Sequence, residues 1–191
     1  MADIPSHHYI YGTCVDYITG ETIVDTDDER CRQELAKLLV EKKGYAKKDM
    51  EPRLRIETLY NGQYVASTID ITIREGEKRF MILRFGPGSI VTRERAAIAA
   101  ARVLEASYQI PLAVVTNGKD AEVLDTYTGK VIRQGLDNIP DKNEAEALVQ
   151  SLRFDPFDDE KRDRERRILN AYDIEVCCAG GPCALPGAPE G

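Results

Sequence analysis

The chain has 191 residues, of which 42% are hydrophobic and 31% charged, and its formal net charge is -7 at pH 7. This length and composition predict one ordinary soluble, globular domain with its own core. The acidic balance excludes a protein whose whole surface binds DNA, because Lys and Arg contacts to phosphate supply most non-specific affinity. A nucleic-acid site would have to be a local basic patch.

The chain also lacks the signals of secretion and of membrane insertion. Its first residues show no basic region followed by an apolar run, and no stretch approaches the ~20 apolar residues that cross a bilayer. Five cysteines are an odd number, which argues against a disulfide framework. We therefore expect a cytoplasmic protein with no membrane partner.

Residues 26–44 predict a helix with recognisable ends. Thr26 and Glu29 fit a capping box, in which the Thr26 hydroxyl caps the helix and the Glu29 carboxylate reaches back to the Thr26 amide. Gly44 lies where a left-handed C-cap is expected. One apolar stripe should face the core, and its members at helical spacing are Cys31, Leu35, Leu38 and Leu39.

The next segment predicts a sheet with a helical crossover. Alternating runs at 54–60 and 65–73, separated by Asn61-Gly62, predict a β-hairpin. A turn at Glu75-Gly76 leads to an apolar strand over 80–85. Residues 92–109 are Ala-rich and contain no Gly or Pro, so they predict a helix packed closely on the sheet. Strands at 111–115 and 121–127, and helices at 142–153 and 157–172, complete the order.

This order predicts an α/β domain, a mixed β-sheet flanked by helices. We divide the chain into an N-terminal segment (1–23), the domain (24–140), C-terminal helices (141–172) and a tail (173–191). The tail is rich in Cys, Gly and Pro, and we expect it to be flexible.

Four segments occur in an order that is typical of one family. They are "DDERCRQELAKLLVEKKGY", "IDITI", "FGPGS" and "YQIPLAVVTNGKDAEVLDTYTGK". Over roughly residues 24–137 the chain resembles the N-terminal domain of the R subunit of type I restriction enzymes, which belongs to the PD-(D/E)XK nuclease superfamily. The resemblance implies a restriction-endonuclease-like fold, Mg²⁺ as cofactor and DNA cleavage as the ancestral reaction.

The resemblance also assigns positions to the catalytic residues. Asp70 matches the metal-binding aspartate. Aligning the Gly-Pro-Gly loop puts Leu83 at the family's glutamate and Phe85 at its lysine, and Leu104, four residues before Tyr108, stands at a family glutamine. Nuclease chemistry needs acidic oxygens for Mg²⁺ and a lysine. The three apolar replacements therefore predict a degenerate centre whose former cleft is packed with hydrocarbon.

The surroundings of Asp70 follow from the strand period. Alternation places Asp70 opposite the apolar face that Ile69, Ile71 and Ile73 are expected to share. Beside an apolar wall its carboxylate must reach water, find a donor such as a threonine hydroxyl, or have a raised pKa, because an isolated buried carboxylate is costly.

Two acidic alternatives could rescue a metal site. Glu77-Lys78-Arg79 offers a Glu-x-Arg pattern after Asp70, although it lies in a polar turn. Glu34 could match the acidic residue that many superfamily members carry on the first helix, although a solvated helix face explains it equally simply.

Three cysteines cluster near the C-terminus, at Cys177, Cys178 and Cys183. With His7 or His8 they could bind Zn²⁺, or they could be reactive thiols. The spacing is not a standard zinc pattern, so a tail without fixed function remains the first interpretation.

Arg93 and Arg95 follow the Gly-Pro-Gly loop, where an ancestral nuclease would approach DNA. They are the candidates for a remaining phosphate contact, against the simpler interpretation as surface charge.

The sequence therefore leaves three functional hypotheses. The first is a catalytically degenerate nuclease domain that needs no cofactor and binds DNA or a protein partner. The second is an active Mg²⁺-dependent DNA endonuclease that uses Asp70 with unrecognised ligands. The third is a metal or thiol module in the Cys-rich tail, carried on an inert scaffold.

Overall fold

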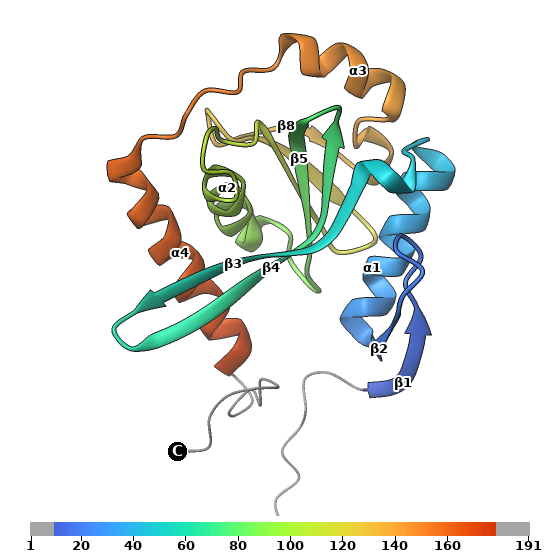
Figure 1. Ribbon diagram of the computed structural model, residues 1–191, viewed down its shortest axis with the longest axis horizontal. Helices are drawn as coiled ribbons and strands as arrows, with labels where there is room; N and C mark the ends of the chain where they lie inside the picture. Colours follow the sequence, from blue (N-terminus) through green and yellow to red (C-terminus); the bar gives the residue numbers. More distant parts are fainter. Residues whose placement is uncertain (1–9, 179–191) are drawn as a thin grey trace, which may run out of the picture.

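The computed structural model describes residues 10–178, with side chains as far as residue 173. These residues form a six-stranded mixed sheet with helices on both faces and a separate two-stranded hairpin (Figure 1). The α/β prediction is confirmed. None of the helices in this part of the chain is both long enough and apolar enough to cross a membrane.

The chain enters through a hairpin that the sequence did not predict. β1 (Ile10–Val15) pairs antiparallel with β2 (Thr22–Thr26), and α1 (Asp27–Lys37) follows directly. Its helical turns continue as η1 (Leu38–Lys42), and η2 (Lys47–Asp49) precedes the sheet.

The predicted ends of α1 are present, with one exception. The Thr26 hydroxyl accepts a hydrogen bond from the Glu29 amide (3.2 Å). Gly44 has φ +73°, and the Tyr45 amide donates to the Leu39 carbonyl (3.0 Å), which closes the left-handed C-cap. The Glu29 carboxylate does not complete the capping box, because it binds side chains described below.

The sheet has the strand order β3-β4-β5-β6-β7-β8. All neighbouring strands are antiparallel except β5 and β6, which are parallel and are joined through η3 (Val91–Arg93) and α2 (Glu94–Val103). The strands are β3 (Met50–Tyr60), β4 (Gln63–Glu75), β5 (Lys78–Phe85), β6 (Leu112–Thr116), β7 (Ala121–Asp125) and β8 (Lys130–Gln134).

Three helices differ in their bounds from the predicted ranges 92–109, 142–153 and 157–172. α2 ends at Val103, because the chain turns back and the Ile110 amide donates to the Ala101 carbonyl (2.9 Å). η4 (Leu136–Asn138) leads to α3 (Lys142–Ser151), and α4 (Asp159–Cys178) extends past residue 172. Residues 173–178, which we assigned to the tail, are therefore helical.

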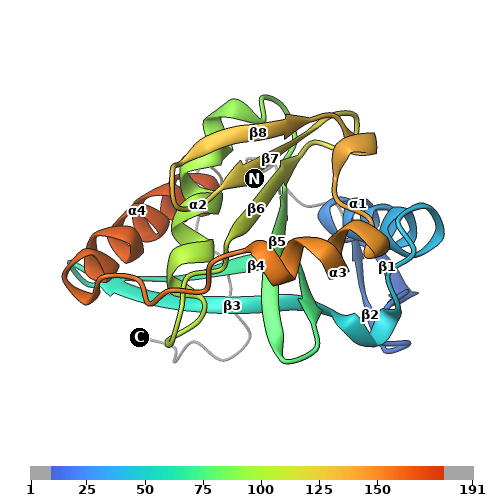
Figure 2. The ribbon, with the colours of Figure 1, turned by 90° about the horizontal axis from the view of Figure 1, so that it is seen from above.

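Each face of the sheet has its own apolar cluster. The α2/α4 cluster contains the alanines of α2, Ile69, Ile82 and Leu169. The α1/α3 cluster contains Leu35 of α1, Leu39 of η1, Ala145 of α3, and Ile71, Ile73 and Leu83. Figure 2 shows α2 and α4 on one side of the sheet and α1 and α3 on the other.

The prediction that Ile69, Ile71 and Ile73 share one face is wrong. Ile69 belongs to the α2/α4 cluster, whereas Ile71 and Ile73 belong to the α1/α3 cluster. The β3–β4 hairpin extends beyond the other strands as a two-stranded arm (Figure 1), and such ribbons twist more strongly than sheets. Arg53, in β3 beside this point, has φ +57°. Asp70 lies where β4 passes from one cluster to the other.

Candidate functional site

Asp70 is buried in β4 next to the end of β5, and both of its carboxylate oxygens accept hydrogen bonds. The Phe85 amide donates to Oδ2 (2.7 Å). Arg32 donates to Oδ1 through Nε (3.1 Å) and Nη2 (2.8 Å). No threonine hydroxyl serves as a donor to Asp70, and the hydroxyl of Thr72, two residues along β4, has no partner within residues 10–178. Asp70 is therefore satisfied by a guanidinium and a backbone amide.

Arg32 bridges two carboxylates. Its remaining nitrogen, Nη1, pairs with Glu29, one turn earlier on α1. The side chains of Arg32, Glu29 and Asp70 are all about one-tenth exposed or less. Burial alone would lower the pKa of Arg32, but the charges of Asp70 and Glu29 outweigh it and raise that pKa. The guanidinium is thus a permanent cation at this position.

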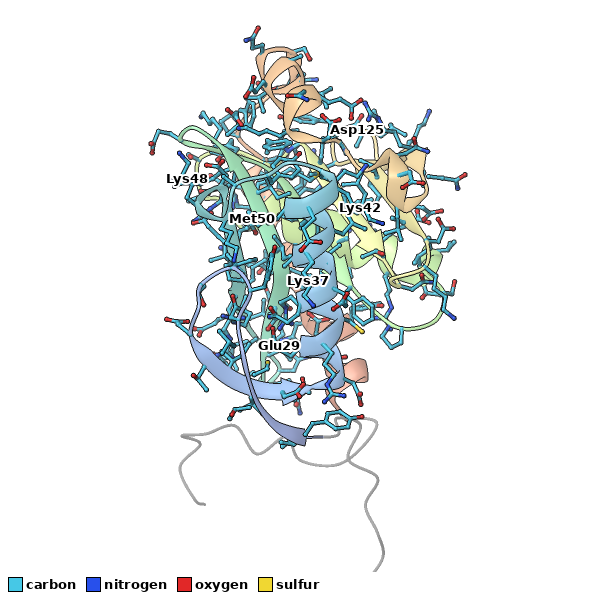
Figure 3. All side chains as sticks on the ribbon, turned by 90° about the vertical axis from the view of Figure 1, so that its right-hand side faces the viewer. Glu29, Lys37, Lys42, Lys48, Met50 and Asp125 are labelled. Carbon is cyan, nitrogen blue, oxygen red and sulfur yellow. The ribbon has the colours of Figure 1, made fainter. Side chains whose placement is uncertain are left out.

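The ion pairs continue from Glu29 to the N-terminal hairpin. Glu29 accepts a hydrogen bond from Gln33 (2.6 Å) and lies 3.5 Å from Arg53 Nη1, which also pairs with Asp16. Figure 3 shows Glu29 at the end of α1 that lies beside the hairpin. We call the connected side chains of Asp16, Glu29, Arg32, Gln33, Arg53 and Asp70 the Asp70 network.

Asp16 anchors the outer end of this network. It is 1% exposed and accepts the Thr19 amide (2.7 Å). Burial favours a higher pKa, but hydrogen bonds from Arg53, the Thr19 amide and Gln33, together with the charge of Arg53, lower the pKa of Asp16 to about 2. The turn after β1 is thereby bound to α1 and β3.

The groups that surround the Asp70 carboxylate are not ligands for a magnesium ion. Mg²⁺ takes oxygen ligands in near-octahedral geometry, whereas the groups that face this carboxylate are N–H donors. Leu83 is fully buried in the α1/α3 cluster. Within residues 10–178, no three His, Cys, Asp or Glu side chains come together as metal ligands would.

The three apolar positions assigned by the resemblance do not meet in one cleft. Leu83 packs in the α1/α3 cluster and Leu104 against the α2/α4 cluster, on opposite faces of the sheet. The Tyr108 hydroxyl accepts the Arg79 amide (3.0 Å) near the start of β5, whereas Asp70 contacts Phe85 at its end. The prediction that Leu104 helps to fill the cleft is wrong, because α2 runs away from Asp70.

The space beside Phe85, which the resemblance predicts to be filled, is not completely packed. Phe85 is partly exposed and borders a groove of about 600 Å³ between α1 and the loop after β6. Lys37 and Lys42 lie along the same helix, beyond Glu29 (Figure 3). The apolar residues of this groove are Cys31, Leu35, Leu38, Phe85 and Leu136.

The two acidic alternatives do not approach Asp70. The Glu34 side chain is 73% exposed and pairs with Lys37 (2.7 Å) at the groove; Glu29 is the α1 carboxylate that is linked to Asp70. In the Glu77-Lys78-Arg79 segment, Arg79 pairs with Glu51 (2.6 Å) and Glu105 (2.7 Å) near the start of β5.

The two candidates for phosphate contacts, Arg93 and Arg95, both interact with other residues of the protein. Arg93 Nη2 donates to the Pro87 carbonyl (3.1 Å), and its guanidinium lies against Gly86. Arg95 pairs with Glu165 of α4 (2.6 Å). The side chains of Cys177 and Cys178, and residues Cys183, His7 and His8, lie outside the described residues.

The sequence did not identify Glu29 and Arg32 as site residues, because its apolar pattern assigned the buried stripe of α1 to Cys31, Leu35, Leu38 and Leu39. Cys31 and Leu38 are only partly buried. The available signal was a Glu and an Arg at i, i+3 in line with Leu35 and Leu39, a spacing that pairs opposite charges on one helix face. The buried members of α1 are Glu29, Arg32, Leu35 and Ala36, followed by Leu39 in η1.

Comparison with known proteins identifies one sequence family. The family described as Type I restriction enzyme R protein N terminus matches residues 27–140, which is more than half of the chain. No curated protein and no solved structure is significantly similar to it.

Proposed function

The chain belongs to the family of type I restriction enzyme R protein N termini, and we propose that it is a non-catalytic member that binds a partner without cleaving DNA. The observation that supports this most directly is the state of Asp70. Its carboxylate, at the family's metal-binding position, is held by Arg32 and the Phe85 amide.

The reaction chemistry gives the reason. Phosphodiester cleavage in a PD-(D/E)XK site needs Mg²⁺ on two or three acidic oxygens and a lysine near the attacking water. Here an arginine already compensates the aspartate, and Leu83 and Phe85 replace the glutamate and the lysine. Leu83 is fully buried, and β5 (Lys78–Phe85) contains no Asp or Glu, so that strand offers no second carboxylate.

The groove beside Phe85 supports a role in binding. Its volume of about 600 Å³ lies within the range of ~300–1,000 Å³ that is usual for ligand sites. On its rim Lys37 and Arg30 pair with Glu34 and Asp25, whereas Lys42 and Lys119 line the groove without an ion pair within residues 10–178. The apolar side chains Leu35, Leu38, Phe85 and Leu136 form its lining between these charges. This apolar lining favours a protein segment with apolar side chains as the partner.

A cleavage assay tests the proposal. Single- and double-stranded DNA is incubated with the protein and Mg²⁺ or Mn²⁺, in parallel with Asp70→Asn. We expect no cleavage by either protein. Cleavage by the wild type that is lost in Asp70→Asn would refute the proposal and establish a metal-dependent endonuclease that uses Asp70 with other ligands.

A further inference from the structure

The edge of the sheet formed by β3 is open. β3 is the first strand in the sheet order, and its partner is β4. Within residues 10–178, no backbone hydrogen bond from another segment reaches its outer side. Figure 2 shows β3 along the outer margin of the molecule. A long free edge strand is a template for pairing with another chain.

The hairpin turn determines which residues face this edge. Tyr60 pairs with Gln63 across the two-residue turn Asn61-Gly62, whose φ angles of +49° and +75° are those of a type I′ turn. The residues that flank such a turn form a hydrogen-bonded pair, and this bonding alternates along the strand. Arg55 and Glu57 therefore direct their N–H and C=O groups away from β4.

The side chains of these two residues are exposed. The alternate residue Thr58 packs toward α4, where Asn170 donates to its hydroxyl (2.9 Å). Arg55 and Glu57 point to the opposite, solvent-facing side of the arm. Within residues 10–178 neither forms an ion pair, although a hydrogen bond to Glu57 raises the pKa of Tyr64. The exposed edge thus carries an arginine and a glutamate two residues apart.

We propose that β3 pairs antiparallel with β3 of a second copy of this chain, about a two-fold axis at Ile56. This register places Arg55 opposite the partner's Glu57, and Glu57 opposite the partner's Arg55. It also brings together the residues whose backbone groups face the edge. Sliding the partner by two residues would oppose Arg55 to Arg55 or Glu57 to Glu57. The strand is thus self-complementary in one register, as an interface with two-fold symmetry requires.

A charge-swap series tests the pairing by sedimentation equilibrium. The wild type should be a dimer, and Arg55→Glu or Glu57→Arg should each raise the dissociation constant about tenfold or more, because two attractive cross-strand pairs become repulsive. The double variant Arg55→Glu/Glu57→Arg should restore the dimer. Lys130→Glu, an exposed charge change on the opposite edge strand β8, is the matched control and should leave it unchanged.

Because all these side chains are exposed, circular dichroism should show the same fold in every variant. A wild type that is monomeric at all concentrations overturns the proposal. So does a dimer that is insensitive to both single changes, and so does a double variant that remains as weak as the single ones. None of these outcomes bears on catalysis, which depends on Asp70 and is tested separately.

Discussion

Replacing Asp70 with asparagine should destabilise the protein, and the sign of this effect distinguishes a structural aspartate from a metal ligand. Where a carboxylate serves as a metal ligand among other carboxylates, removing its charge relieves repulsion and stabilises the metal-free protein. Here Asp70 compensates Arg32 and accepts the Phe85 amide, so removing the charge leaves buried donors poorly satisfied.

The magnitude follows from burial. The Arg32 and Asp70 side chains are both 10% exposed, so solvent screening is small. Removing one partner of a buried pair costs about 3–5 kcal/mol. Arg32 keeps Glu29, and the asparagine side chain of the variant would keep one acceptor oxygen, so we expect the lower limit, about 3 kcal/mol. For a protein of this size that lowers the Tm by about 6–12 °C.

Urea unfolding and thermal melts measure this effect with EDTA and with excess Mg²⁺. Glu34→Gln is the matched control, because its carboxylate is 73% exposed and pairs at the surface; the change should cost less than about 1 kcal/mol. Mg²⁺ should not raise the wild-type Tm, since a ligand that binds only the folded state would stabilise it.

Two results would refute the reasoning. One is an Asp70→Asn variant that is as stable as the wild type, or more stable, in EDTA. The other is a wild-type Tm that rises with Mg²⁺ while that of the variant does not.

Two further predictions concern Asp16, at the outer end of the Asp70 network, and two positions on β5. The pKa of Asp16 is held at about 2, below its ordinary 3.8, so its contribution to stability is complete above about pH 4 and is lost as the pH falls toward 2. The Asp16→Asn variant should lack this loss when the free energy of unfolding in urea is measured against pH. A variant with the same pH profile as the wild type would contradict the prediction. Leu83→Glu puts a carboxylate into the α1/α3 cluster and should lower the free energy of unfolding by on the order of 3–5 kcal/mol. Phe85→Lys, at the groove, should lower it by only about 1 kcal/mol. Equal losses in urea unfolding would show that burial does not distinguish the two positions.

The sequence predicted the core elements because their signals are local. The Asn61-Gly62 turn, the Thr26 cap, the Gly44 cap and the apolar strand at 80–85 each follow from residues that are adjacent in the chain. β1, β2 and β8 were missed. β8 alternates between exposed and partly buried residues, so its apolar pattern is weak. In β1, Gly12 and Thr13 interrupt the apolar residues, and Ile10, Tyr11 and Val15 stay exposed although they are apolar.

The candidate site was predictable only in part. Asp70 was placed correctly on a strand, but its partner Arg32 is 38 positions away in sequence. The left-handed backbone of Arg53 (φ +57°) lies beside the point where Ile69 and Ile71 enter different clusters, and it has no signal in the period-two pattern. Long-range ion pairs and twist depend on how elements pack, and alternation within one strand does not report them.

The family match ends at residue 140, but the packed structure continues beyond it. α4 contributes Leu169 to the α2/α4 cluster, and its Glu165 and Asp173 pair with Arg102 and Arg84. A fragment cut at residue 140 would leave these two arginines without their carboxylates and would leave α2 as the only helix on that face of the sheet. The boundary of sequence similarity is therefore not a boundary of folding, and α4 has to accompany this module whenever it is transplanted into another chain.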